Sequence, residues 1–85
     1  MTKENIAQDV KAYILKEFLP GESSAAIDQT TPLVSGGILD SIATIKLAAF
    51  LEKQYHIQFK AHEFKDHFEN IASIASIVAK KVTEK

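Results

Sequence analysis

One serine stands between two glycines and a long apolar segment, in the run Gly36–Ile42, which reads Gly-Gly-Ile-Leu-Asp-Ser-Ile. Asp40 is a preferred residue type at helix N-caps, so we expect a helix to begin at Ser41. The free backbone N–H groups and the dipole at a helix start favour negative charge, by about 0.3–1 kcal/mol at an exposed site. The Ser41 hydroxyl is therefore a good place for a phosphodiester, and the glycines put no side chain in the way of a docking enzyme.

The same serine has no surroundings that would make it a catalytic nucleophile. The serine of a nucleophile elbow is flanked by two glycines, whereas Leu39 and Ala43 flank Ser41 at those positions. A serine hydroxyl also needs a general base, and no local motif supplies one. We predict no catalytic residue and no enzymatic activity.

A pair of histidines, His62 and His67, briefly resembles the helix of a zinc protease. That motif needs its histidines four residues apart on one helix face, and these are five apart. No third ligand is indicated, so we predict no metal site. His56 is expected near the C-terminus of a helix, where a cation is favoured.

Composition limits the classes of protein that the chain can belong to. With 85 residues and 46% hydrophobic content, we predict a single domain over residues 1–85 with a modest core. The net charge of −1 gives no reason to expect nucleic-acid binding. The longest apolar stretch, Leu47–Leu51, is too short to span a membrane. The absence of cysteine suits a reducing cytoplasm, and we expect a cytoplasmic monomer.

Helical periodicity dominates the chain and predicts an all-α fold. Apolar residues of the first segment recur at Ile6, Val10, Ile14 and Phe18, whereas the second segment is apolar almost all round. Asn70 is a suitable N-cap for the last helix. The predicted helices cover about residues 3–18, 41–55, 61–68 and 71–82.

Two of the three connections between these helices are long enough to carry structure of their own. The first, Glu22–Leu39, is long for a compact domain, and such loops are often functional. We expect several of its apolar residues to hold it on the core, with a short helical turn near Ala25–Ile27. The apolar residues are Ile27, Leu33, Val34, Ile38 and Leu39. The second, His56–Lys60, is expected to be extended, with Ile57 and Phe59 pointing inward.

The run Thr31–Ile42 resembles the attachment-site region of acyl and peptidyl carrier proteins. Their signature is a glycine, a variable residue, a hydrophobic residue, Asp-Ser and another hydrophobic residue. Gly36 precedes the matching positions, which are Gly37, Leu39, Asp40, Ser41 and Ile42. The order of loop and helices is also similar over nearly the whole chain.

This resemblance implies a small four-helix bundle with a long first loop and a short third helix. It implies that Ser41 Oγ is esterified by 4′-phosphopantetheine, which a separate transferase donates from coenzyme A with the help of Mg²⁺. The arm ends in a thiol that carries acyl or aminoacyl groups as thioesters. The protein would then be a non-catalytic carrier that presents intermediates to other enzymes.

In carriers of this family the second helix is the main face read by partners, which here would include a ligase and downstream synthases or transferases. The resemblance implies a partner face at Ile42, Ala43, Thr44, Ile45, Lys46 and Lys53, with Ala43, Thr44, Lys46 and Lys53 exposed. Carriers of bacterial fatty acid synthesis are acidic along this helix, whereas Ala43, Lys46 and Lys53 stand where acids are common. The resemblance therefore favours a specialised pathway.

Three functions remain open from the sequence. The first is an acyl carrier of a fatty-acid-like, polyketide or other specialised pathway. The second is an aminoacyl or peptidyl carrier, of the D-alanyl-carrier or nonribosomal peptide type, loaded by an adenylating ligase. The third is a small helical interaction module without a prosthetic group, which explains the apolar second helix but not the glycines before Asp-Ser.

Overall fold

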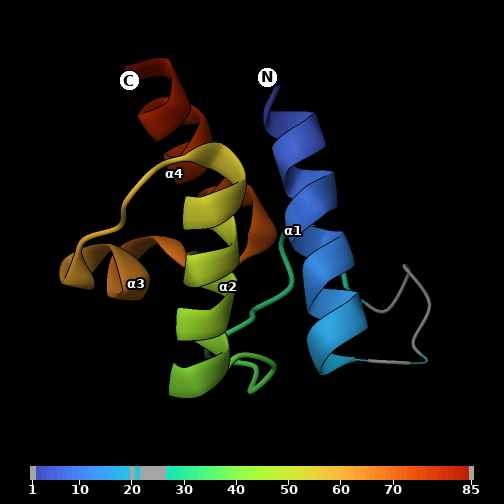
Figure 1. Ribbon diagram of the computed structural model, residues 1–85. Coiled ribbons are helices and arrows are strands. Elements are labelled where there is room, and N and C mark those ends of the chain that lie inside the picture. The colour runs from blue at the N-terminus through green and yellow to red at the C-terminus, as the bar shows by residue number, and fades with distance from the viewer. Residues whose placement is uncertain (1, 20, 22–26, 85) are drawn as a thin grey trace.

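The computed structural model describes residues 2–19, 21 and 27–84, without the side chains of 65, 66 and 84, and these residues form an all-helical bundle (Figure 1). The helices are α1 (Lys3–Phe18), α2 (Ser41–Tyr55), α3 (Ala61–His67) and α4 (Ile71–Glu84). The described ranges contain no strand. The predicted all-α fold is confirmed. The third helix ends one residue earlier than predicted, at His67, and the fourth continues two residues further.

Side-chain caps fix where the helices begin. The carboxylate of Asp40 accepts the Ala43 N–H at 2.7 Å, as predicted for the start of α2. Asn70 accepts the Ser73 N–H at 2.8 Å and so caps α4, which was also predicted. The position of Ser41 at the first residue of α2 is therefore set by local chemistry.

The core lies between α1, α2 and α4, with α1 and α4 packed most extensively against each other. Its largest fully buried side chains come from all three helices, from the loop before α2 and from the residue after α3. They are Ile6, Val10, Ile14, Ile27, Leu33, Leu39, Leu47, Leu51, Phe68, Ile71, Ile74 and Val78. In Figure 1 the start of α2 lies at the lower end of the bundle, away from the first turn of α1 and the last turn of α4.

Four apolar residues of the loop before α2 pack on the core, and one of them, Ile38, is only partly buried. Ile27, Leu33 and Leu39 are buried, in agreement with the prediction, whereas Val34 is 44% exposed. The helical turn predicted near Ala25–Ile27 falls on residues that lie outside the described part of the chain, apart from Ile27, which is not helical.

The connector between α2 and α3 is extended after a left-handed residue, His56, with φ of 55°. Ile57 is buried, and the ring of Phe59 packs edge-to-face against Phe68, so both side chains point inward as predicted. The side chain of His56 was expected to act near this helix end, but it is the backbone N–H of His56 that closes α2, by donating to the Glu52 carbonyl. None of the described helices is long and apolar enough to cross a membrane.

Candidate functional site

Ser41 is the first residue of α2, and its side chain is exposed. The residue before it is Asp40, whose carbonyl accepts both the Thr44 N–H at 2.9 Å and the Thr44 hydroxyl at 2.8 Å. Within the described residues, the N–H groups of Ser41 and Ile42 have no acceptor in the protein. The first N–H groups of a helix are free in this way unless a side chain, a ligand or water binds them. The site thus combines a free hydroxyl with two free backbone donors.

The turn before the site requires glycine at two positions, for two different reasons. A Cβ on Gly36 would lie 2.3 Å from the backbone oxygen of Pro32, which is closer than atoms can pack. Gly37 has φ of +83°, in the left-handed region that other residues rarely adopt. The Gly37 N–H donates to the Val34 carbonyl at 3.1 Å. The glycines therefore shape the turn, in addition to leaving the approach open as the sequence suggested.

One residue distant in sequence holds this turn in place, and sequence reasoning missed it. The carboxylate of Glu69, in the connection between α3 and α4, accepts the N–H and the hydroxyl of Ser35. The carbonyl of Glu69 also accepts the Leu33 N–H at 2.6 Å. Ser35 and Glu69 are 34 residues apart, and no motif in the sequence links them.

Comparison with known protein families decides what this arrangement is. The model of the phosphopantetheine attachment site family matches residues 14–78, which span most of the chain and include Ser41 with the turn before it. The chain belongs to this family. No curated protein in the comparison matches the chain. The resemblance to carrier proteins and the predicted cofactor, 4′-phosphopantetheine, are both confirmed.

The surface around Ser41 suits such a carrier, because large apolar side chains gather there. The most exposed large hydrophobic residues of the described chain are Ile42 at 66%, Ile45 at 60% and Val34 at 44%. A surface hollow of about 560 Å³ opens beside the serine, between the start of α2 and the start of α3. It is lined by Val34, Leu39, Asp40, Ser41, Thr44, Ile45, Ala61 and Phe64.

Two residues of the predicted partner face are not where the sequence placed them. Ala43 and Thr44 were expected to be exposed, but they are buried, with 7% and 8% of their surfaces accessible. They face the bundle because α2 packs against both α1 and α4, and the Thr44 hydroxyl is turned back to the Asp40 carbonyl. Their predicted exposure is therefore wrong. Lys46 and Lys53 are exposed as expected.

His62 and His67, the pair singled out in the sequence, do not form a metal site with other described residues. His62 is exposed and His67 is partly buried, on the short helix α3. Among the described residues, no group of three or more His, Asp or Glu side chains is placed to hold a metal ion.

The residues at Ser41 fit the prosthetic group. The exposed Oγ is reachable, and the free N–H groups of Ser41 and Ile42 suit the negative charge of a phosphodiester. The nearest carboxylate along the chain, Asp40, is occupied by the Ala43 N–H. The chain has no cysteine and so supplies no thiol of its own.

Proposed function

We propose that Ser41 is the residue that bears 4′-phosphopantetheine and that the protein is an acyl carrier protein. Residues 1–85 would act as one carrier domain that holds acyl intermediates as thioesters and presents them to partner enzymes. The observation that carries the proposal is the exposed Ser41 hydroxyl at the start of α2, inside the segment matched by the family.

The loading step uses Ser41 as an acceptor and leaves the chemistry to a transferase. A bond forms between Ser41 Oγ and the phosphorus of the phosphopantetheine part of coenzyme A. The pyrophosphate bond of coenzyme A breaks, the adenosine bisphosphate part leaves, and the hydroxyl proton passes to a base of the transferase. The bound group supplies a thiol for thioester formation.

In this step the chain itself positions the Ser41 hydroxyl and stabilises the negative charge of the phosphodiester. Asp40 caps α2 and so fixes the direction of its first turn. The N–H groups of Ser41 and Ile42 favour the negative charge of the phosphodiester, by about 0.3–1 kcal/mol at such an exposed helix start. Gly36 and Gly37 shape the turn that a transferase must approach.

The experiment that tests this proposal is enzymatic loading followed by intact mass measurement. We expect the protein to gain one phosphopantetheine when incubated with coenzyme A, Mg²⁺ and a broad-specificity phosphopantetheinyl transferase. Ser41→Ala should lose this gain completely but keep the fold, because an exposed first-turn serine contributes at most about 1 kcal/mol. Circular dichroism checks the fold of the variant. No mass gain, under conditions that load a known carrier, would contradict the proposal.

The partner face that we propose is the exposed side of α2, which runs from Ile42 beside Ser41 to Lys53 in the last turn of the helix. It comprises Ile42 and Ile45, which offer apolar contact, and Lys46 and Lys53, which have no ion-pair partner among the described residues. The first turn of α2 carries no acidic residue. A face of this charge favours partners of a specialised fatty-acid-like or polyketide pathway. We expect the carrier to be a monomer and to meet these enzymes in the cytoplasm.

A double charge reversal tests the role of the two lysines. Lys46→Glu with Lys53→Glu should slow loading by the cognate acyl ligase about threefold to tenfold, because opposite charges on two surfaces accelerate their association. Lys3→Glu with Lys11→Glu, on α1, is a matched control that should leave the rate unchanged. Equal loading rates of the wild type and the α2 double variant would remove the lysines from the partner face.

Aminoacyl or peptidyl carriage is the second candidate, and the cations of α2 favour it over a general fatty-acid role. An adenylating ligase would then load the thiol with an amino acid, of which D-alanine is one candidate. Incubating the loaded carrier with such a ligase, ATP and D-alanine, and measuring the mass, distinguishes this cargo from an acyl group. The third possibility, an interaction module without a prosthetic group, is disfavoured by the family match.

A further inference from the structure

We propose that Glu69 is a positioning residue for the modification of Ser41. It holds the turn of residues 34–37 in the shape that the transferase accepts. This inference rests on the proposed function, because it concerns the same reaction at the same serine.

Glu69 holds the loop with both its backbone and its side chain. Its carbonyl accepts the Leu33 N–H at 2.6 Å. Its two carboxylate oxygens lie 3.3 and 3.4 Å from the Ser35 nitrogen, and Oε1 also accepts the Ser35 hydroxyl. Hydrogen bonds that involve a charged group are stronger than neutral ones. One residue of the α3–α4 connection therefore fixes two points of the loop, two residues apart.

The two contacts have different consequences for α2. The Leu33 carbonyl accepts the Leu39 N–H at 2.8 Å, and both leucines are buried. The backbone bond from Leu33 to Glu69 thus anchors the base of the loop, next to the Asp40 cap. The carboxylate instead holds Ser35, at the exposed tip. Removing only the carboxylate should therefore release the tip and leave the start of α2 in place.

The tip lies where a transferase must dock. Val34 and Ser41 line the same hollow, so the turn and the reactive hydroxyl face one space. Residues 34–37 are all exposed. Two features already fix their backbone, the tight approach of Gly36 to Pro32 and the positive φ of Gly37. The carboxylate of Glu69 adds the contact that ties this shaped turn to the body of the bundle.

Steady-state kinetics of transferase loading tests the role of Glu69, with the apo carrier as the varied substrate. In Glu69→Ala we expect KM to rise about fivefold to tenfold with kcat within twofold, since the loop loses ordering contacts but Ser41 keeps its chemistry. Glu69→Gln should return KM to within about twofold of the wild type, because its amide oxygen still accepts from Ser35. Ser35→Ala, which keeps the backbone N–H, should raise KM about twofold to threefold.

A control variant and a second measurement separate positioning from stability. Glu17→Ala removes an exposed carboxylate at the last turn of α1 and should leave KM unchanged. Amide hydrogen exchange on the apo protein should be faster at Ser35 and Gly37 in Glu69→Ala, and unchanged at Thr44 inside α2.

Each outcome decides one of the two proposals. If the wild type gains no phosphopantetheine, the proposed function fails and the role of Glu69 fails with it. If the wild type loads and Glu69→Ala has the wild-type KM, only the positioning role is overturned. It is also overturned if Glu69→Gln is as poor a substrate as Glu69→Ala, because the charge rather than the hydrogen bonds would then matter. Should Glu69→Ala be unfolded by circular dichroism, Ser35→Ala carries the test alone.

Discussion

The two ends of α2 are built in opposite ways. At its start, Ser41 and Ile42 are exposed, and the chain before them is a turn held by hydrogen bonds. At its end, Tyr55 is buried, and its hydroxyl donates to the carboxylate of Asp9 on α1. Burial, and after it the Asp9 contact, raise the pKa of Tyr55. The start of α2 is thus exposed, whereas its last residue is joined to α1 by a hydrogen bond.

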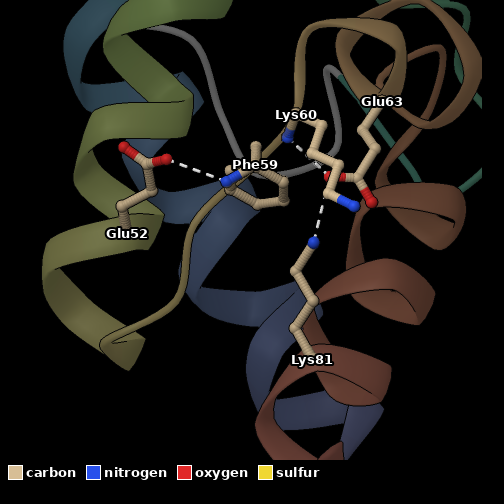
Figure 2. Close-up of polar contacts among 5 residues, drawn as sticks. All are labelled: Glu52, Phe59, Lys60, Glu63 and Lys81. Atoms are coloured by element: carbon tan, nitrogen blue, oxygen red, sulfur yellow. Dashed lines mark hydrogen bonds and ion pairs between the residues drawn. The ribbon is translucent and has the colours of Figure 1, made fainter. Parts of the chain in front are cut away.

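The connector after α2 is held by polar contacts with the neighbouring helices (Figure 2). The Glu52 carboxylate accepts the Phe59 N–H at 2.9 Å, so the end of α2 holds the connector. Glu63 of α3 accepts the Lys60 N–H at 2.7 Å and pairs with Lys81 of α4 at 2.9 Å. The ammonium of Lys81 also lies 5.6 Å from the centre of the Phe59 ring. These contacts tie the connector after α2 to α2, α3 and α4.

Each end also borders a hollow, and the larger one is not at the serine. The hollow at the end of α2 measures about 890 Å³, and its lining includes Lys53 and His56. The hollow at the start measures about 560 Å³ and is mainly apolar, with Ile45 and Phe64 in its lining. The size of a hollow therefore does not mark the candidate site. The candidate site is instead recognised by the exposed Ser41 hydroxyl at the start of a helix.

Gly36→Ala is the change that should damage the start of α2 most while sparing its end. The new Cβ would meet the backbone oxygen of Pro32 at 2.3 Å, so the turn must move. We expect a loss of about 2–3 kcal/mol in the free energy of unfolding, as for overpacked sites. Transferase loading should slow at the same time, measured by intact mass over time. Urea denaturation measures the stability.

Gly37→Ala is the matched control for that change. Its Cβ would meet nothing within 4 Å, so only the positive φ of +83° opposes it. The expected loss is smaller, about 1–2 kcal/mol for a residue with a Cβ in the left-handed region. In both variants amide exchange at Phe59 and Lys60 should match the wild type. Faster exchange there would show that the two ends of α2 are coupled and do not hold their conformations independently.

The sequence was sufficient where structure depends on neighbours along the chain. The Asp40 and Asn70 caps were predicted because each side chain reaches a backbone N–H three residues ahead. The glycine-containing turn and the serine after it were found in the same way. Phe59 was expected to point inward because apolar residues alternate in its connector.

The sequence was insufficient where packing or distant contacts decide. The resemblance to carrier proteins placed Ala43 and Thr44 on the exposed side of α2, but both are buried. Since α2 is apolar almost all round, its periodicity does not say which side meets α1 and α4, so it could not correct this. The contact between Ser35 and Glu69 joins residues 34 positions apart and depends on how α4 docks. No local pattern records a contact of this kind.

Glu63→Gln tests the other end of α2, and its effect should be the smallest. Burial alone would raise the pKa of Glu63, but the Lys60 N–H and the Lys81 ammonium outweigh it and hold the pKa below its usual value of 4.5. The folded state therefore binds the proton less readily than the unfolded state does. The stability that this carboxylate contributes is present above pH 4.5 and is lost as the pH falls below it.

Thermal unfolding at pH 7, 5, 4 and 3 measures this loss. Near neutral pH the variant should be less stable by about 1 kcal/mol, since its amide oxygen can still accept the Lys60 N–H and the attraction of the ion pair is partly offset by the cost of burying its charges. As the pH falls toward 3 the wild type should lose more stability than the variant, so the gap between them should close. Glu17→Gln, on exposed α1 surface, is the control and should follow the wild type. If the curves of wild type and Glu63→Gln stay parallel, the ion pair does not tie the connector to α4, and the far end of α2 is less firmly built than its contacts indicate.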